Sequence, residues 1–594
     1  MDSSWRSLAD IAVEHARRTP QRVVVRRRTR SGWDDVTAAA LLEELESVAR
    51  GLVAAGVGPG DRVGLMASTR YEWTVVDLAV WAAGAVTVPV YETSSADQLA
   101  WILEDSGAVA CLVETPGHAR TLASVADRAP ALRRTWTIED GGMAALAAEG
   151  RVVEAGVLDE RRAGLDAGAL ATIIYTSGTT GRPKGCELTH GNFLAECTSA
   201  VEALPELFEA EDAATLVFLP LAHVFGRMIQ IAVLMKGLVL GHTDVGRLTK
   251  DLATFQPTFV LAVPRVFEKV YDGARRKAVA AGRGRVFGLA SDTAIAYSRA
   301  LERRGPGPLL RARRAVFDRL VYAKLRAALG GRVQWAVSGG APLGERLGHF
   351  FRGAGVTVLE GYGLTETTAA ACVNTRAAQR VGTVGRALPR FELRVAADGE
   401  VQVRGGHVFR GYWRNPEATA AVLTQDGWFR TGDLGTLDAD GFLRITGRAK
   451  EILVLSSGKN VAPAPLEDAV RAHALVSQCV VVGDERPFAA ALVTLDGEAL
   501  AAWAAARGAG ARPVDELPTH PDVLAEVQSA IDAANRTVSD AEAIKRFTVL
   551  RDDFTVESGH LTPSMKVRRA VVLEEFATDV DAMYSPRDGT RVAV

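Results

Sequence analysis

Hydrophobic and polar residues follow two alternating patterns along the first 360 positions of the chain. Short apolar runs, such as residues 63–67 and 86–90, are separated by segments in which apolar residues recur at helical spacing, such as residues 71–83. Apolar runs of this length are typical of buried strands, whereas the second pattern is typical of helices. Repeated strand–helix units predict largely parallel sheets that are covered by helices.

The strand pattern recurs further along the chain, and its character changes after residue 391. Further strands are predicted at residues 108–113, 171–174, 214–218, 259–263, 333–337 and 356–359. Beyond residue 391 the predicted strands, 400–404, 427–434 and 442–445, lie among crowded turn residues, which indicates an antiparallel subdomain. The predicted fold class is therefore α/β, with doubly wound βα subdomains followed by a small β subdomain.

Length and overall composition narrow the class of protein. With 594 residues the chain is too long for a single core, so two or more domains are expected. Hydrophobic residues make up 48% and charged residues 24%, which describes an ordinary soluble globular protein. The net charge of −2 carries no overall signature of nucleic-acid binding, so no nucleic-acid partner is expected.

Neither the N-terminus nor the apolar segments predict export or a membrane span. The first 21 residues carry charges throughout and lack the apolar core of a signal peptide. The most apolar windows, 75–90 and 229–240, are interrupted by Asp77 and Lys236 and fall short of the roughly 18 apolar residues of a spanning helix. Five dispersed cysteines with no Cys-x-x-Cys spacing favour reduced thiols, and a cytoplasmic location is predicted.

One segment departs from the even charge balance of the rest of the chain. Residues 275–326 contain 14 lysine and arginine residues against three acidic residues, in a largely helical pattern. A solvated helical face explains such a segment equally well as a surface that attracts an anionic membrane or a polyanionic cofactor. Both interpretations stay open at the level of sequence.

A polar, glycine-rich segment directly follows the predicted strand 171–174. It carries Thr176, Ser177, Gly178, Thr179, Thr180, Gly181 and Lys184. Glycines let the backbone approach an anion, N–H and hydroxyl groups donate to phosphate oxygens, and the lysine adds a positive charge. No Gly-Lys-Ser/Thr sequence closes the segment, so it differs from the Walker loop. A phosphate-binding loop is predicted, in an enzyme or in a nucleotide-binding regulator.

Other polar motifs follow the later predicted strands, where a doubly wound sheet binds its ligands. Residues 338–343 follow one strand and residues 360–367 follow the next. Their glycines permit a flat base to lie against the backbone, and Tyr362 offers a ring for stacking. Thr365 can donate to phosphate, and Glu366 supplies the oxygen ligand that Mg²⁺ prefers beside phosphates. Asp433 can accept hydrogen bonds from two ribose hydroxyls.

The order of these motifs resembles the acyl-adenylate-forming superfamily, which includes acyl-CoA synthetases, adenylation domains and luciferases. The resemblance spans nearly the whole chain and continues through residues 440–451 and 561–566. Residues 91–95, 219–225, 263–269 and 456–463, together with the basic helical stretch between Glu268 and Ser338, resemble the long-chain fatty-acid–CoA ligases in particular.

This resemblance implies a two-step reaction. A fatty carboxylate first attacks the α-phosphorus of ATP, which gives an acyl-adenylate and pyrophosphate. The thiol of coenzyme A then displaces AMP and forms the thioester. The implied ligands are therefore a fatty acid, ATP with Mg²⁺, and coenzyme A. Phosphoryl chemistry of this kind depends mainly on positioning and charge neutralisation.

The resemblance also implies the roles of individual residues. The β- and γ-phosphates are assigned to Thr176, Ser177, Thr179, Thr180 and Lys184, with Gly178 and Gly181 in the same loop. The adenine site is assigned to Gly339, Gly340, Ala341, Glu360, Gly361, Tyr362 and Gly363. Thr365 is expected at the α-phosphate, Glu366 on Mg²⁺, and Asp433 and Arg448 on ribose. His223 is expected near the carboxylate, and Lys566 is expected to bridge the carboxylate and α-phosphate oxygens in the first step.

Two domains and a hinge follow from the same resemblance. The expected division is an N-terminal adenylate-forming domain, residues 1–447, and a small mobile α+β domain, residues 448–594, with the hinge near Lys450. After adenylation the small domain is expected to rotate and withdraw Lys566. Ser457 and Gly458 would then line the channel for the pantetheine arm of coenzyme A.

Two other ligase activities remain open beside the long-chain CoA ligase. The first is an acyl-adenylate ligase that loads a carrier protein, although no evident insertion near Lys450 hampers domain rotation. The second is an aryl or short-chain CoA ligase. Val224, Phe225 and the apolar segment 229–235 fit a long acyl chain, but the adenylation motifs are common to all three activities.

Overall fold

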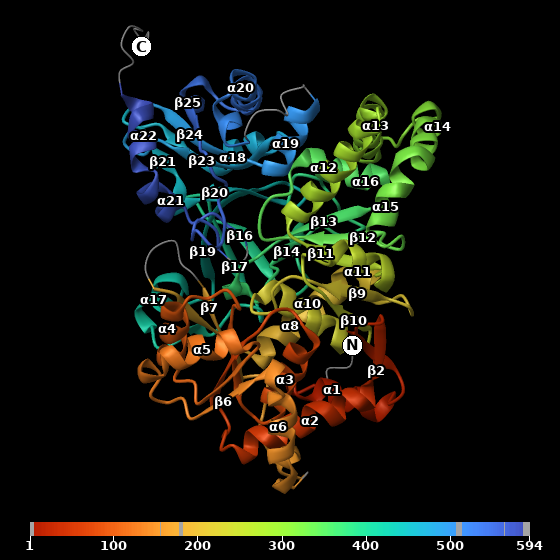
Figure 1. The fold of residues 1–594 in the computed structure, drawn as a ribbon, viewed down its shortest axis with the longest axis vertical. Coiled ribbons are helices and arrows are strands. Elements are labelled where there is room, and N and C mark those ends of the chain that lie inside the picture. The colour runs from red at the N-terminus through yellow and green to blue at the C-terminus, as the bar shows by residue number, and fades with distance from the viewer. Residues whose placement is uncertain (1–4, 155, 177–181, 507–513, 563–564, 586–594) are drawn as a thin grey trace.

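The computed structural model describes residues 5–154, 156–176, 182–506, 514–562 and 565–585 (Figure 1). The predicted phosphate-loop residues Ser177, Gly178, Thr179, Thr180 and Gly181 lie outside this part of the chain. The N-terminal domain contains two large sheets and a smaller antiparallel sheet, and the C-terminal domain lies above them in Figure 1. This arrangement confirms the predicted α/β class with a large N-terminal and a small C-terminal domain.

The first large sheet has the strand order β18-β8-β7-β4-β3-β5-β6. Its strands are β3 (Arg62–Met66), β4 (Val86–Val90), β5 (Ala110–Val113), β6 (Arg134–Thr137), β7 (Leu170–Thr176), β8 (Lys184–Thr189) and β18 (Gly411–Tyr412). The strands from β7 to β6 are parallel, whereas β8 runs antiparallel to both β7 and β18. The β7–β8 connection therefore lies at the point where parallel pairing ends.

The second large sheet has the order β15-β14-β13-β12-β11-β9-β10-β1-β2. Its strands are β1 (Val23–Arg28), β2 (Trp33–Thr37), β9 (Ala214–Val217), β10 (Val239–His242), β11 (Phe259–Ala262), β12 (Trp335–Ser338), β13 (Thr357–Tyr362), β14 (Cys372–Val373) and β15 (Arg386–Ala387). The strand predicted at 356–359 continues to Tyr362, because Gly361 and Tyr362 pair antiparallel with β14. The expectation that residues 360–362 follow the strand is therefore wrong.

The helices of the N-terminal domain cover these sheets, as the repeated strand–helix pattern predicts. They are α1 (Asp10–Arg18), α2 (Ala38–Ala54), α3 (Tyr71–Ala82), α4 (Ala96–Ser106), α5 (Pro116–Ser124), α6 (Gly142–Glu149), α7 (Gly156–Ala163), α8 (His190–Ala203), α9 (Pro205–Phe208), α10 (Val224–Met235), α11 (Leu248–Phe255), α12 (Pro264–Ala280), α13 (Gly284–Leu301), α14 (Pro308–Phe317), α15 (Ala323–Ala328), α16 (Glu345–Ala354) and α17 (Pro416–Val422).

The two most apolar segments of the chain form buried helices of the N-terminal core. Nearly every residue of α3 and α10 is inaccessible to solvent. Asp77 on α3 and Arg227 on α10 are both fully buried and form an ion pair, in which Arg227 Nε donates to Asp77 Oδ2 over 2.9 Å. None of the helices in the described part of the chain combines the length and the apolar character that a bilayer span requires.

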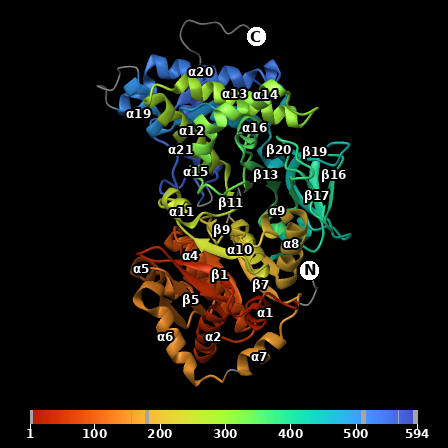
Figure 2. The same ribbon diagram turned by 90° about the vertical axis from the view of Figure 1, so that its right-hand side faces the viewer.

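The small antiparallel sheet and the C-terminal domain complete the fold (Figure 2). The sheet has the order β16-β17-β19-β20, with strands Glu392–Val395, Glu400–Arg404, Phe429–Leu437 and Leu443–Arg448. The C-terminal domain contains β21 (Leu453–Val454), β22 (Asn460–Val461), α18 (Pro463–Arg471), β23 (Val476–Val482), β24 (Ala489–Leu495), α19 (Gly497–Ala506), α20 (Pro521–Asn535), β25 (Ile544–Val549), α21 (Arg569–Glu575) and α22 (Ala577–Tyr584). Its buried apolar clusters are separate from the N-terminal core.

Candidate active site

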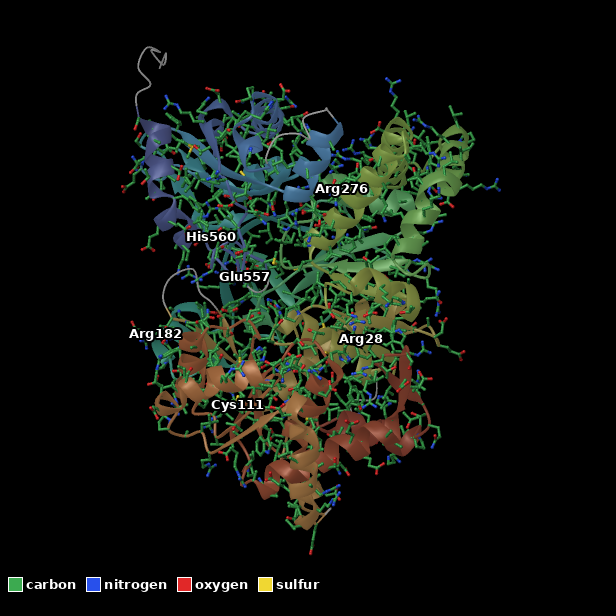
Figure 3. The ribbon with its side chains drawn as sticks, viewed as in Figure 1. Arg28, Cys111, Arg182, Arg276, Glu557 and His560 are labelled. Carbon is green, nitrogen blue, oxygen red and sulfur yellow. The ribbon has the colours of Figure 1, made fainter. Side chains whose placement is uncertain are left out.

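The predicted phosphate loop connects two paired strands. Thr176 ends β7 and Lys184 begins β8, and the two residues are directly opposite each other in the antiparallel ladder. The end of the loop is fixed by Trp101, whose indole N–H donates to the carbonyl of Pro183 over 3.0 Å. The guanidinium of Arg182, which is labelled in Figure 3, lies 4.7 Å from the centre of the Trp101 ring. The loop therefore joins the sheet at defined positions on both sides.

Lys184 and Glu366 meet at Tyr412, a residue that the sequence motifs did not indicate. The Lys184 ammonium lies 5.0 Å from the centre of the Tyr412 ring, and the Tyr412 hydroxyl donates to Glu366 Oε1 over 2.8 Å. Thr365, next to Glu366, is buried at the start of a short 3₁₀ turn. The predicted phosphate lysine and the predicted metal-binding carboxylate thus both interact with one side chain, the lysine with its ring and the carboxylate with its hydroxyl.

The glycines of the predicted adenine site lie on adjacent strand ends. A Cβ atom at Gly339 would lie 3.4 Å from the Phe225 ring and 3.6 Å from the carbonyl oxygen of Gly361. A Cβ atom at Gly363 would lie 1.5 Å from the carbonyl oxygen of Ala369, so only glycine fits there. The structure therefore brings the two glycine motifs and the predicted acyl-pocket residue Phe225 together.

Glu360 is buried beside this site and binds protein backbone. Its Oε2 accepts a hydrogen bond from the Leu343 N–H over 3.2 Å. Burial raises the pKa of Glu360 to about 7. Gly340 and Ala341, which precede Leu343, are exposed, so the carboxyl group of Glu360 anchors the loop whose tip faces solvent.

Asp433 connects the predicted adenine and ribose residues. Only 3% of its surface is exposed, and its Oδ2 accepts a hydrogen bond from the Tyr362 hydroxyl over 2.5 Å. Its Oδ1 lies 3.0 Å from Arg448 Nε, and the two residues are opposite each other on β19 and β20. Burial, together with the charge of Asp433, raises the pKa of the Tyr362 hydroxyl well above its usual value, so this hydroxyl stays a hydrogen-bond donor.

His223 precedes α10 and caps that helix. Its Nδ1 accepts a hydrogen bond from the Phe225 N–H over 3.2 Å. Burial, together with the nearby Lys566 ammonium, lowers the pKa of His223 to about 3. The neutral imidazole therefore carries its proton on Nε2, which leaves an uncharged donor available. Val224 is buried and Phe225 is half-buried directly after it.

Lys566 extends from the C-terminal domain toward these groups of the N-terminal domain. Its backbone N–H donates to Thr562 Oγ1 over 3.0 Å, and Met565 beside it has a φ of +64°, a left-handed conformation that side chains other than glycine rarely adopt. Water reaches the side chain, but desolvation by the surrounding protein and the positive charge of Arg448 lower the pKa of Lys566. Asp433 and Glu366 act in the opposite direction.

The predicted hinge and the predicted coenzyme A loop are exposed. Lys450 lies in a single 3₁₀ turn, Ala449–Glu451, that directly follows β20. Ser457 and Gly458 are in the exposed turn between β21 and β22, where Gly458 has a φ of +79°. Neither segment contacts the groups around Asp433 through an ion pair or a hydrogen bond among the described residues.

Comparison with known families identifies the class of protein to which this arrangement of residues belongs. The chain belongs to the AMP-binding enzymes: the family description "AMP-binding enzyme" matches residues 13–413, and "AMP-binding enzyme C-terminal domain" matches residues 450–588. These two matches confirm the predicted superfamily and cover both domains.

Two curated relatives are similar over most of the chain. A protein of Mycobacterium tuberculosis named long-chain-fatty-acid–CoA ligase FadD15 is 51% identical over 98% of this chain and 97% of its own length. Long chain acyl-CoA synthetase 7, peroxisomal, from Arabidopsis thaliana is 32% identical over 93% of this chain and 81% of its own length.

Solved structures share the fold at lower identity. The A domain of a carboxylic acid reductase from Segniliparus rugosus, in complex with AMP and a co-purified carboxylic acid, aligns with a TM-score of 0.75 at 23% identity, over 98% of this chain and 95% of that chain. ATP-bound MatB from Rhodopseudomonas palustris aligns with a TM-score of 0.67 at 24% identity, over 96% of this chain and 99% of that chain. At these identities the likeness concerns the fold.

Proposed function

We propose that this protein is an ATP-dependent long-chain fatty-acid–CoA ligase that releases AMP and pyrophosphate. The observation that carries the proposal is the position of Lys566, whose ammonium lies near enough to Arg448 at the end of β20, and to Asp433 and Glu366 of the N-terminal domain, for their charges to shift its pKa. These groups are the ones expected to surround the α-phosphate and ribose of ATP. The 51% identity to a long-chain-fatty-acid–CoA ligase over nearly both complete chains supports the same activity.

In the first step an oxygen of the fatty carboxylate attacks the α-phosphorus, the bond to the bridging oxygen breaks, and pyrophosphate leaves. Lys566 would place its ammonium between the two anionic reactants, whose negative charges otherwise repel each other. His223 would donate from Nε2 to a carboxylate oxygen without adding a charge. Asp433, held by Tyr362 and Arg448, would accept from the ribose hydroxyls and fix the nucleotide.

The donor set around Glu366 fits Mg²⁺. In the described part of the chain no group of three or more His, Cys, Asp or Glu side chains forms a metal cage. Mg²⁺ commonly binds through one or two carboxylates plus substrate phosphates, and Glu366 offers Oε2 while Oε1 accepts from Tyr412. The ion would neutralise phosphate charge, and Lys184 would add a second positive charge to the same region.

In the second step the sulfur of coenzyme A attacks the acyl carbonyl carbon, the thiol proton is released, and AMP leaves with the electron pair of the broken acyl–phosphate bond. Rotation about the turn at Lys450 would withdraw Lys566 and bring the exposed Ser457–Gly458 turn to the site. A hinge residue must absorb a large change in backbone dihedral angles, which a single exposed turn permits.

The acyl chain would lie along α10. This helix begins with Val224 and Phe225, and it is buried along most of its length and apolar except for Arg227 and Gln230. An apolar lining favours a hydrocarbon chain over an aryl or short acid that needs polar partners.

The test is a parallel assay of pyrophosphate and thioester with palmitate, ATP, Mg²⁺ and coenzyme A. Palmitoyl-CoA that depends on coenzyme A is the expected product. Palmitoyl-adenylate without thioester would instead support a carrier-protein acceptor. Neither product with palmitate, but turnover of benzoate or butyrate, would support an aryl or short-chain ligase. A variant Lys566→Ala distinguishes enzymatic pyrophosphate from background hydrolysis.

A further inference from the structure

The basic segment, residues 275–326, projects at one end of the molecule. It comprises the end of α12, the antiparallel pair α13 and α14, and the start of α15, and both Figure 1 and Figure 2 place α13 and α14 side by side there. Twelve large apolar side chains are exposed in the described part of the chain, and seven of them belong to this segment, which is less than a tenth of the sequence. Exposed apolar surface is therefore concentrated where the positive charge is concentrated.

Three of these apolar side chains form a stripe along α14 and the turn after it. Leu309, Val316 and Leu320 are 83%, 57% and 52% exposed, and their spacing of seven and four residues puts them on one face. The opposite face packs inward, since Arg314 Nε donates to the Gly353 carbonyl over 2.8 Å. The stripe has no partner among the described residues.

The cations of the segment divide into an inner and an outer set. Arg276 pairs with Glu498 over 3.2 Å (Figure 3), Arg326 pairs with Asp318 over 2.8 Å, and Arg314 binds backbone. The outer set is exposed and has no ion pair with any described residue: Arg275, Lys277, Arg283, Arg285, Arg299, Arg303, Arg304, Arg311, Arg313, Arg319 and Lys324. Of the three acidic residues, Asp318 and Glu302 are engaged by arginines, which leaves Asp292. The outer surface is therefore almost purely cationic.

We propose that the basic segment docks the protein on an anionic lipid bilayer. Arginines and lysines would bind lipid phosphates, while Leu309, Val316 and Leu320 would enter the boundary between headgroups and acyl chains. A symmetric contact with a second copy would place this cationic surface against itself, which like-charge repulsion disfavours. A nucleic acid would use the cations but offers no apolar layer for the stripe.

Co-sedimentation with large unilamellar vesicles tests this proposal without reference to ligase activity. The full chain is mixed at low salt with vesicles of phosphatidylcholine containing about one third phosphatidylglycerol, and with vesicles of phosphatidylcholine alone. Binding is expected to be at least roughly tenfold tighter to the anionic vesicles and to weaken as salt rises. Equal binding to both vesicles, or no binding to either, would overturn the proposal.

Two paired variants separate the charge from the apolar stripe. Arg311→Gln with Arg313→Gln is expected to weaken vesicle binding roughly 25-fold, at about fivefold for each cation. Leu309→Gln with Val316→Gln is expected to weaken it by roughly tenfold or more, because apolar insertion is lost. The control is Val152→Gln, at a residue that is also 83% exposed but outside the basic segment, and it should bind as the unmodified chain does.

The apolar pair decides between a membrane and a generic polyanion site. If the arginine pair loses binding while Leu309→Gln with Val316→Gln keeps it, the surface recognises negative charge alone and the docking proposal is wrong. All substituted side chains are exposed, so folding should be retained, and circular dichroism of each variant checks this before binding is measured.

Discussion

The hydroxyl of Tyr412 donates a hydrogen bond to Glu366 Oε1 over 2.8 Å, while the ring of the same tyrosine lies 5.0 Å from the Lys184 ammonium. One side chain thus orients a carboxylate and a cation that belong to two distant motifs. Tyr412 reaches this position because β18 pairs antiparallel with β8, opposite Cys186. The two motifs therefore depend on a strand of two residues from elsewhere in the chain.

Tyr412→Phe should weaken catalysis through Glu366 and leave the ring contact with Lys184 intact. A hydrogen bond to a charged group contributes about 1.5–3 kcal/mol, so kcat/KM for ATP in pyrophosphate release should fall roughly 10-fold to 100-fold. The Mg²⁺ concentration that gives half-maximal activity should rise. Tyr322→Phe is the matched control, since it removes a tyrosine hydroxyl that donates to the Ala290 carbonyl outside the site. Equal effects of both changes would contradict a role of Tyr412 at Glu366.

Lys566→Ala should abolish the first half-reaction selectively. Removing a preorganised charge lowers a rate by about 10²–10³, so pyrophosphate release should fall by that factor. Thioester formation from supplied palmitoyl-adenylate should persist, because the second step does not use this ammonium. Lys545→Ala, which removes the partner of Asp540 on the same domain, should leave both steps unchanged. A comparable loss in both half-reactions would contradict the assigned role.

Lys450→Pro should spare adenylation and slow thioester formation. Proline fixes φ near −65°, so the turn Ala449–Glu451 would lose the freedom that domain rotation requires. Lys450→Ala removes the same charge but leaves φ free, and both half-reactions should then proceed. Single-turnover measurement of each half-reaction separates the two steps. If proline slows both equally, or neither, the hinge assignment is wrong.

The stability of the protein should depend on pH through Glu360. Burial raises the pKa of this carboxyl to about 7 in the folded state, above its ordinary value of 4.5. The folded chain therefore binds the proton more tightly, and the stabilisation is present below about pH 4.5 and is lost as the pH rises through about 7. Glu360→Gln should remove a pH-dependent difference of about 3 kcal/mol between the two limits.

Urea denaturation of Glu360→Gln and the unmodified chain at about pH 5 and pH 8 measures this difference, since the other groups titrate equally in both proteins. The unmodified chain should lose more stability between the two pH values than the variant. If the free energy of unfolding changed with pH equally in both proteins, Glu360 would have an ordinary pKa in the folded state.

The sequence predicted the order of elements well because burial imposes its own pattern. The run at 86–90 is a fully buried parallel strand. Few other structures accommodate an apolar run of that length. The limit of β13 was missed because its last two residues are strand only through pairing with β14, which the local pattern does not contain. The apolar window around Asp77 forms the buried helix α3, and its ion pair with Arg227 could not be predicted, because the two residues are 150 positions apart.

In the candidate site, too, the residues with a local sequence signal were predicted and those that depend on strand pairing were not. Motifs rich in glycine and charge indicated Asp433, Arg448 and Lys566. In the structure Asp433 and Arg448 form an ion pair, and the charges of both act on the pKa of Lys566. Tyr412 was missed because a single tyrosine after a glycine has no periodic or charge signal, and its role arises from strand pairing across more than two hundred residues. The assigned roles of all these residues remain predictions, and the half-reaction assays above test them.

The contacts between the two domains include exchangeable ion pairs. Arg265 and Asp496 are 3.1 Å apart, and Arg276 and Glu498 are 3.2 Å apart, and in each pair one residue comes from α12 and the other from the C-terminal domain. Solvent-accessible pairs of this kind each contribute at most about 1 kcal/mol, and water replaces them readily. Each domain has its own buried apolar cluster, so both hydrophobic cores stay shielded from water when the domains separate. The proposed rotation of the C-terminal domain would therefore require no partial unfolding of either domain.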